Sequence, residues 1–142
     1  MKTYVIMVST VFGQEHSRSG EETLFEDSVL TGMKIHTIRH NYELWEKRFE
    51  KINAGEACLS IRKWEGKAYR SKQVEIKRLA MEDGIGLEKL NVQHDSYYCG
   101  LVPITPWALA RNDGLSWEDF LEWFRGAEGD KAIIHFTGFR YS

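Results

Sequence analysis

The chain has 142 residues, of which 42% are hydrophobic and 28% charged, and its formal net charge is −2. This length suits one domain with its own core, so we predict a single domain over residues 1–142. The composition excludes a disordered or low-complexity protein, and no apolar run reaches the length of a membrane span.

The charges are unevenly distributed along the chain. Residues 34–78 contain 12 Lys and Arg against 6 Asp and Glu, whereas the remaining residues contain 7 against 15. A basic middle segment suits a small anionic ligand such as a nucleotide, but not duplex nucleic acid, which needs many phosphate contacts at once. A solvated strand face that carries Lys and Arg explains the pattern equally well. Cys58 and Cys99 form no CxxC motif, and we interpret them as reduced thiols of a cytoplasmic protein.

The first half of the chain combines strand and helix patterns. Ser19 and Glu22 have the spacing of a capping box, and Gly32 can end the helix that follows. Asn41 can cap a second helix, which Gly55 ends. The predicted elements are a strand over 4–12, a helix over 20–31, a turn and short strand over 33–39, a helix over 41–54 and an alternating strand over 57–63.

The second half favours strands with two short helices before the last one. Pro106 follows Thr105 at a typical first helical position, and Ser116 can cap the next helix. The predicted elements are a hairpin turn at 64–67, strands over 69–79, 87–92 and 132–141, and helices ending at Gly114 and spanning about 117–124. This order predicts an α+β fold, a small, mixed and partly closed β-barrel with peripheral helices.

The segment Gly32-Met-Lys-Ile-His-Thr-Ile-Arg39 carries the candidate chemistry. Lys34 and Thr37 are three residues apart, so a turn can bring the ammonium to the hydroxyl. A threonine hydroxyl needs a base to act as a nucleophile. Lysine is a base only when neutral, which requires its pKa to fall from about 10.4 by about three units, or roughly 4 kcal/mol. Burial or a nearby cation such as Arg39 lowers it. On local sequence alone, two exposed cations and an ordinary strand threonine are the simpler interpretation.

This segment, preceded by a helix and followed by an alternating strand, resembles the ASCH family of PUA-like domains. The later stretch from Asn112 to Phe124 resembles the acidic-glycine helix start of that family. The resemblance extends from about residue 20 to the final strand. It implies a small β-barrel related to RNA-binding PUA domains.

Some bacterial members of this family are amidohydrolases that remove the acetyl group from acetylcytidine with a Lys, a Thr and a Glu. By position, Lys34 and Thr37 match the first two residues, and Asp113 stands where those enzymes have Glu. The resemblance implies that Lys34 takes the proton of Thr37, whose oxygen attacks the amide carbonyl. Asp113 would handle the proton at the leaving nitrogen, and Arg39 would stabilise negative charge. No cofactor is implied. The additional segments 41–54 and 94–103 imply a different pocket and substrate.

Two other groups of residues are weaker candidates. In the hairpin from Trp64 to Gln73, Trp64 and Tyr69 could stack on a base while Arg70 holds a phosphate, although a surface turn fits equally well. His36 and His40 are four residues apart, a metal-binding spacing on a helix. Because no helix is predicted there and no HExxH motif is present, we predict no metal site.

The sequence therefore predicts a domain that binds a nucleoside, a nucleotide or a modified base. An amidohydrolase built on Lys34, Thr37 and Asp113 is one form of this prediction. A non-catalytic module that binds single-stranded RNA is the alternative. A structural or partner-binding protein would follow if its own side chains fill the pocket.

Overall fold

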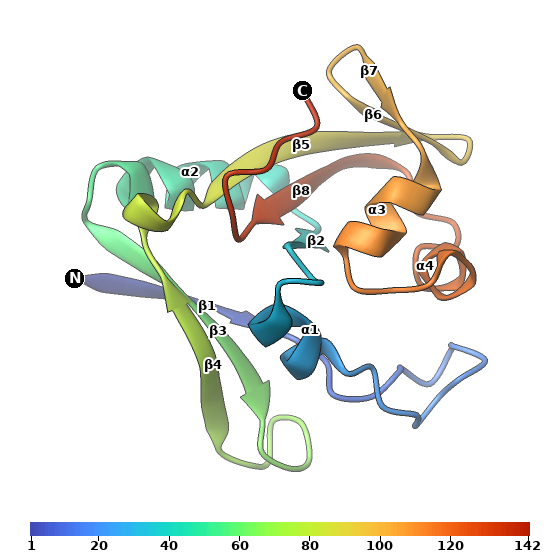
Figure 1. Cartoon of the computed structure of the whole chain (residues 1–142), viewed down its shortest axis with the longest axis horizontal. Helices are drawn as coiled ribbons and strands as arrows, with labels where there is room; N and C mark the ends of the chain where they lie inside the picture. Colours follow the sequence, from blue (N-terminus) through green and yellow to red (C-terminus); the bar gives the residue numbers. More distant parts are fainter.

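The computed structural model describes residues 1–142 as four α-helices and eight β-strands (Figure 1). The strands are β1 (Lys2–Met7), β2 (His36–Arg39), β3 (Ala57–Trp64), β4 (Gln73–Leu79), β5 (Gly86–Gln93), β6 (Ser96–Cys99), β7 (Val102–Ile104) and β8 (Gly129–His135). The helices are α1 (Phe25–Thr31), α2 (Tyr42–Asn53), α3 (Pro106–Asn112) and α4 (Trp117–Trp123). The α+β class predicted from the sequence is confirmed.

The strands form two separate sheets. The three-stranded sheet has the order β1-β3-β4, with β1 parallel to β3. The five-stranded sheet has the order β2-β8-β5-β6-β7, and all its neighbours are antiparallel. The hydrogen-bonded ladders form no closed barrel. In Figure 1, α2 lies near one end of the five-stranded sheet, and α3 and α4 lie toward the other.

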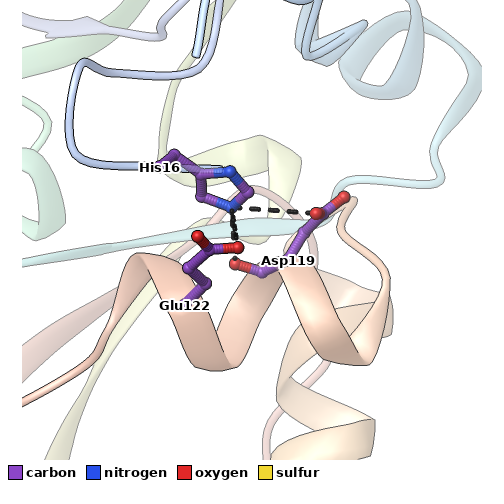
Figure 2. A group of neighbouring side chains, drawn as sticks. All are labelled: His16, Asp119 and Glu122. Atoms are coloured by element: carbon purple, nitrogen blue, oxygen red, sulfur yellow. Dashed lines mark hydrogen bonds and ion pairs between the residues drawn. The ribbon is translucent and has the colours of Figure 1, made fainter. Parts of the chain in front are cut away.

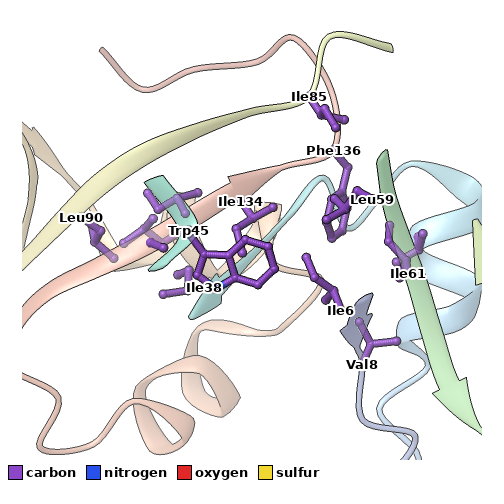
Figure 3. Close-up of a cluster of buried hydrophobic side chains, with 14 of the residues drawn as sticks. Ile6, Val8, Ile38, Trp45, Leu59, Ile61, Ile85, Leu90, Ile134 and Phe136 are labelled. Atoms are coloured by element: carbon purple, nitrogen blue, oxygen red, sulfur yellow. The ribbon is translucent and has the colours of Figure 1, made fainter. Parts of the chain in front are cut away.

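One hydrophobic cluster contains residues from both sheets and all four helices. Figure 3 shows where the sheets meet: Ile6, Leu59 and Ile61 come from the three-stranded sheet, and Ile38, Leu90 and Ile134 from the five-stranded sheet. Helix α2 contacts β3, β5 and β8, so its apolar face contributes to both sides of this core. Burying a side chain of this size stabilises the fold by about 1.5–3 kcal/mol.

The second predicted helix is confirmed closely. Helix α2 begins after Asn41, whose side chain accepts a hydrogen bond from the Leu44 backbone amide at 3.2 Å. The three apolar residues predicted to share a face, Trp45, Phe49 and Ile52, are all buried. Asn41 adopts a left-handed conformation with φ of 60°, which asparagine tolerates better than most residues.

The first predicted helix is shorter than expected, and the capping box at Ser19 does not form. Helix α1 begins at Phe25, and Gly32 ends it with φ of 81°. The preceding segment turns back on itself instead: Val11 pairs with Glu22 in an isolated β-bridge, and the Thr23 hydroxyl donates to the Ser9 carbonyl at 2.6 Å. These contacts satisfy backbone groups that a longer helix would have used.

The strand predictions differ mainly at their ends. β1 ends at Met7 and β8 at His135, earlier than the predicted 12 and 141. β4 begins only at Gln73, so the turn after β3 is a loop over residues 65–72. The segment 94–103, expected to be a loop, contains β6 and most of the short edge strand β7. No helix of the chain combines the length and apolarity needed to cross a bilayer.

Candidate functional site

The candidate site begins where the end of α3 meets the segment after α1. The Lys34 and Asp113 backbones form an isolated antiparallel bridge, and the Ile35 amide donates to the Asn112 carbonyl at 2.8 Å. Gly114 permits this approach, because its φ is 77° and an added Cβ would lie 3.0 Å from the Lys34 Cβ. Two segments 79 positions apart therefore lie in contact.

The ammonium of Lys34 is buried and fully engaged. Its Nζ donates to the backbone carbonyl of Asp113 at 2.8 Å and to its Oδ1 at 3.0 Å, and it lies 4.3 Å from the centre of the Phe25 ring. Lys34 is 3% exposed and Asp113 is 4% exposed. The prediction of an exposed Lys34, the simpler interpretation of the sequence, is wrong. The carboxylate of Asp113 reaches the lysine without the additional methylene of a glutamate.

Burial and charge act in opposite directions on this pair. Burial lowers the pKa of Lys34, and the Asp113 carboxylate opposes that change. Burial also acts to raise the pKa of Asp113, but the charge of Lys34 and the hydrogen bond from His36 outweigh it, so this pKa lies below its ordinary value. Asp113 is therefore a carboxylate at neutral pH. Lys34 loses its proton more readily than an exposed lysine.

The motif residues surround one small cavity. Lys34, Thr37, Arg39 and Asp113 all line a cavity of about 40 Å³, which apolar side chains such as Phe25 and Phe124 complete. This volume holds a water molecule or a small polar group but not a nucleobase. Thr37 is 5% exposed and takes part in no side-chain hydrogen bond, so its hydroxyl is free to bind a ligand atom.

A wider pocket lies next to this cavity. Its volume is about 620 Å³, within the range of small-molecule sites, and it shares Val8, Ser9 and Arg39 with the small cavity. Trp64 and Tyr69 line it, with ring centres 5.3 Å apart. Both residues therefore line one pocket, and the stacking role remains a prediction.

Arg70 lies elsewhere. Its side chain is exposed and is absent from the lining of either pocket, although its backbone amide donates to the Lys67 carbonyl at 3.1 Å. The neighbouring cation Lys67, which belongs to the same basic hairpin but was not chosen as a site residue, lines the wider pocket. The loop over residues 65–72 decides which cation faces inward, because β4 starts later than the hairpin pattern indicated.

A chain of hydrogen-bonded polar groups, which are buried at His36 and half-buried at Asn112 and Tyr141, leads away from Asp113. The Nδ1 of His36 lies 3.1 Å from the Asp113 Oδ1, its Nε2 lies 2.6 Å from the Tyr141 hydroxyl, and the Asn112 amide donates to that hydroxyl at 2.9 Å. Because Asn112 donates to the Tyr141 oxygen, the hydroxyl proton can go to His36 Nε2. The proton on Nδ1 then bonds to the carboxylate. Tyr141 is 105 residues from His36, so no sequence pattern connects them.

The hydrogen bonds of His36 also bear on whether His36 and His40 could bind a metal ion together. Both ring nitrogens of His36 have hydrogen-bond partners, whereas His40 is exposed beyond the end of β2. The two residues lie on and after a strand, so the helical spacing argument does not apply to them.

A separate cluster, formed by His16, Asp119 and Glu122, has the residue types of a metal site (Figure 2). The Nε2 of His16 lies 3.7 Å from Asp119 Oδ1 and 3.6 Å from Glu122 Oε2. However, the Arg18 backbone amide donates to His16 Nδ1 at 3.0 Å, so in the neutral ring the proton is on Nε2. A metal would need that nitrogen unprotonated. The cluster is better explained as a set of hydrogen bonds that attach the segment before α1 to α4 than as a metal centre.

The chain matches no protein-family model, no curated protein and no solved structure. Its function is therefore inferred from the geometry of the site.

Proposed function

We propose that this chain binds a nucleoside, a nucleotide or a modified base in the composite site formed by the two adjoining pockets. One observation carries the proposal. The four polar residues of the motif line a small cavity, and Arg39 connects that cavity to a pocket lined by Trp64 and Tyr69. A planar, polar ligand matches both parts, because aromatic rings stack on its face and buried polar groups bind its edge.

The sizes of the two pockets indicate which part of the ligand each pocket can hold. The wider pocket is large enough for a base with its sugar, whereas the small cavity accepts only a group such as an amino, carbonyl or methyl substituent. The free Thr37 hydroxyl can donate to or accept from that group, and the Asp113 carboxylate can only accept. In this proposal the chain is an ASCH-type, PUA-like domain whose two sheets take the place of the barrel.

A second candidate, hydrolysis of an N-acylated cytidine, is favoured by the unbonded Thr37 hydroxyl. In this reaction Lys34, as the neutral amine, would take the Thr37 proton while Oγ1 attacks the acyl carbon. Arg39 would stabilise the oxyanion, and Lys34 would pass the proton taken from Thr37 to the leaving nitrogen as the C–N bond breaks. Water would then release the acyl group from Thr37. Against it, the Lys34 ammonium is bonded to Asp113 rather than to Thr37. We therefore place binding before catalysis.

Isothermal titration calorimetry with cytidine, N4-acetylcytidine, uridine and adenosine tests the binding proposal. We expect at least one of them to bind wild-type protein. Tyr69→Ala should weaken that binding by about 5- to 150-fold through loss of stacking. Tyr69 is 88% exposed, so its removal spares the fold. Trp107→Ala, another exposed aromatic outside both pockets, is the matched control and should change nothing. Absence of binding to all four nucleosides and to their 5′-monophosphates would contradict the proposal.

The hydrolysis candidate has its own test on the same compounds. Product formation from N4-acetylcytidine should be lost almost completely in both Thr37→Ala and Lys34→Ala, because members of one catalytic unit act together. Activity that persists in Thr37→Ala would refute this mechanism. Binding without turnover would leave base recognition as the function.

A further inference from the structure

Arg39 is a cation without an anionic partner. It lies on β2, half-buried, and no carboxylate is within ion-pair distance of its guanidinium. One nitrogen, NH2, donates to the Met7 carbonyl at 2.6 Å, whereas Nε is buried and has no hydrogen-bond partner. Burial lowers the pKa of this guanidinium, and the charge of Asp113 opposes the change. A half-buried cation whose Nε is buried without an acceptor is stabilised when an anion binds beside it.

The wider pocket has the opposite charge balance to the chain as a whole. Arg39 and Lys67 line it, and no Asp or Glu does, although acidic residues outnumber basic ones by 21 to 19 in the chain. The pocket beside α1 shows the contrast, because its lining includes Glu22, Glu26 and Asp27. Two aromatic rings and two cations without any acid are the groups that bind an anionic aromatic ligand.

Two neighbouring cations on β3 are already engaged. Lys63 forms an ion pair with Glu26, and the Arg62 side chain donates to Ser60 and Gln73. Lys67 has no ion pair or side-chain hydrogen bond within the chain and is exposed, so its ammonium is free to approach a ligand. Among the residues that line the wider pocket, Arg39 and Lys67 are therefore the two cations that a bound anion can use.

We infer that the preferred ligand is a mononucleotide, whose phosphate binds Arg39 and Lys67, rather than a neutral nucleoside. The inference rests on the proposed function and narrows its ligand class. A phosphate monoester has the charge to compensate the unpaired guanidinium and the oxygen geometry for its planar set of donors. The adjacent rings of Trp64 and Tyr69, tilted by 51° to each other, then offer the base an aromatic face in the same pocket. The phosphate and the base can therefore bind in one pocket, and no second basic surface is needed for the phosphate.

Titration of each ribonucleoside against its own 5′-monophosphate, at low ionic strength, tests this inference. We expect the nucleotide to bind at least about tenfold more tightly than the matching nucleoside, as for hydrogen bonds between charged groups. Lys67→Gln should remove a large part of that preference, because it should weaken nucleotide binding more than nucleoside binding. Lys77→Gln, an exposed lysine on β4 outside the pocket, should change neither affinity.

Each possible result of these titrations either supports or overturns the inference that the ligand is a mononucleotide. Equal affinity for nucleosides and nucleotides overturns the inference but leaves the proposed function standing, whereas no binding of either class overturns both. Tighter binding of inorganic phosphate than of the nucleotide, or of a short single-stranded RNA at the same nucleotide concentration, also overturns it. Arg39→Lys keeps the charge and removes the planar donor set, so it should weaken nucleotide binding more than nucleoside binding. Lys67→Gln keeps the test valid if Arg39→Lys fails to fold.

Discussion

The Nζ of Lys34 lies 3.0 Å from the Oδ1 of Asp113, and this bond joins two side chains that are 3% and 4% exposed. Neither charge has access to bulk water, so each depends on the other for its stability. The carbonyl of Asp113 and the imidazole of His36 complete the arrangement. This pair is therefore the centre of the candidate site, and we expect it to contribute to the stability of the fold.

The first prediction concerns the stability of this pair. Lys34→Met and Asp113→Asn should each lower the free energy of unfolding by about 3–5 kcal/mol, because each leaves a buried partner uncompensated. The double variant should lose clearly less than the sum. Urea denaturation measures all three. The exposed pair Lys51 and Glu56, 3.6 Å apart, is the control, and the same cycle there should show a coupling of less than about 1 kcal/mol. Additive losses at Lys34 and Asp113 would contradict the prediction.

The second prediction concerns the length of the acidic side chain. Asp113→Glu should weaken binding and lower stability by about 1–3 kcal/mol, because the additional methylene must enter a cavity of only about 40 Å³. Asp113 already reaches Lys34, so the longer side chain adds no contact. Calorimetry and urea denaturation measure the two effects. A gain in affinity or in hydrolysis would show that the shorter side chain limits the site.

The third prediction concerns the chain of polar groups that leads away from Asp113. Tyr141→Phe removes one hydroxyl and leaves His36 Nε2 and the Asn112 amide without that partner. We expect a loss of about 1–3 kcal/mol in the free energy of unfolding. Tyr98→Phe is the control, because Tyr98 is half-buried and its hydroxyl makes no hydrogen bond, and it should cost less than about 0.5 kcal/mol. Equal effects of the two substitutions would exclude a structural role for the Tyr141 hydroxyl.

The fourth prediction is a loss of stability in mild acid. Burial and the neighbouring His36 lower the pKa of His135 from 6.5 to about 4, and the Glu88 hydrogen bond only partly opposes this. Between pH 6.5 and about 4 the unfolded chain therefore binds a proton that the folded chain does not. Stability present above pH 6.5 is lost as the pH falls to about 4, by at most about 3 kcal/mol.

Urea midpoints measured from pH 7.5 to pH 4 test this dependence. The groups that face His135 are His36, Glu88 and Arg140, together with Tyr141. Glu88 has a pKa below its ordinary value: burial acts to raise it, but hydrogen bonds from Tyr141 and Ser142 outweigh that effect. It therefore adds a further loss only below about pH 4.5. His135→Gln should flatten the change between pH 6.5 and pH 4.5, whatever its effect at pH 7.5. An unchanged slope in this variant would contradict the assignment.

The sequence predicted best the elements that carry strong local signals. Asn41 and the spacing of Trp45, Phe49 and Ile52 identified α2 because capping and helical periodicity act within a few residues. The alternation over β3 identified a strand for the same reason. The capping-box spacing at Ser19 was misleading, because the bridge between Val11 and Glu22 held that segment in a turn. A tertiary contact outweighed a local preference there.

Part of the candidate site was also accessible from the sequence. The spacing of Lys34, Thr37 and Arg39, together with the family resemblance, singled out three residues that line one cavity, and it placed Asp113 with them. Arg70 was chosen over Lys67 as the site residue of the basic hairpin, because the hairpin pattern does not tell where β4 begins. His36 was considered only for metal binding. Its actual partners, Asp113 and Tyr141, lie 77 and 105 residues away.

The sequence by itself determined the α+β class, the basic middle segment and the residues of the motif, because composition and short-range periodicity are properties of neighbouring residues. Only the tertiary structure decided the charge environment of those residues. Burial, the 3.0 Å bond between Lys34 and Asp113, and the lack of an ion pair at Arg39 arise from segments that are distant along the chain. Desolvation and hydrogen bonding depend on what surrounds a group in space, and local sequence does not specify that surrounding.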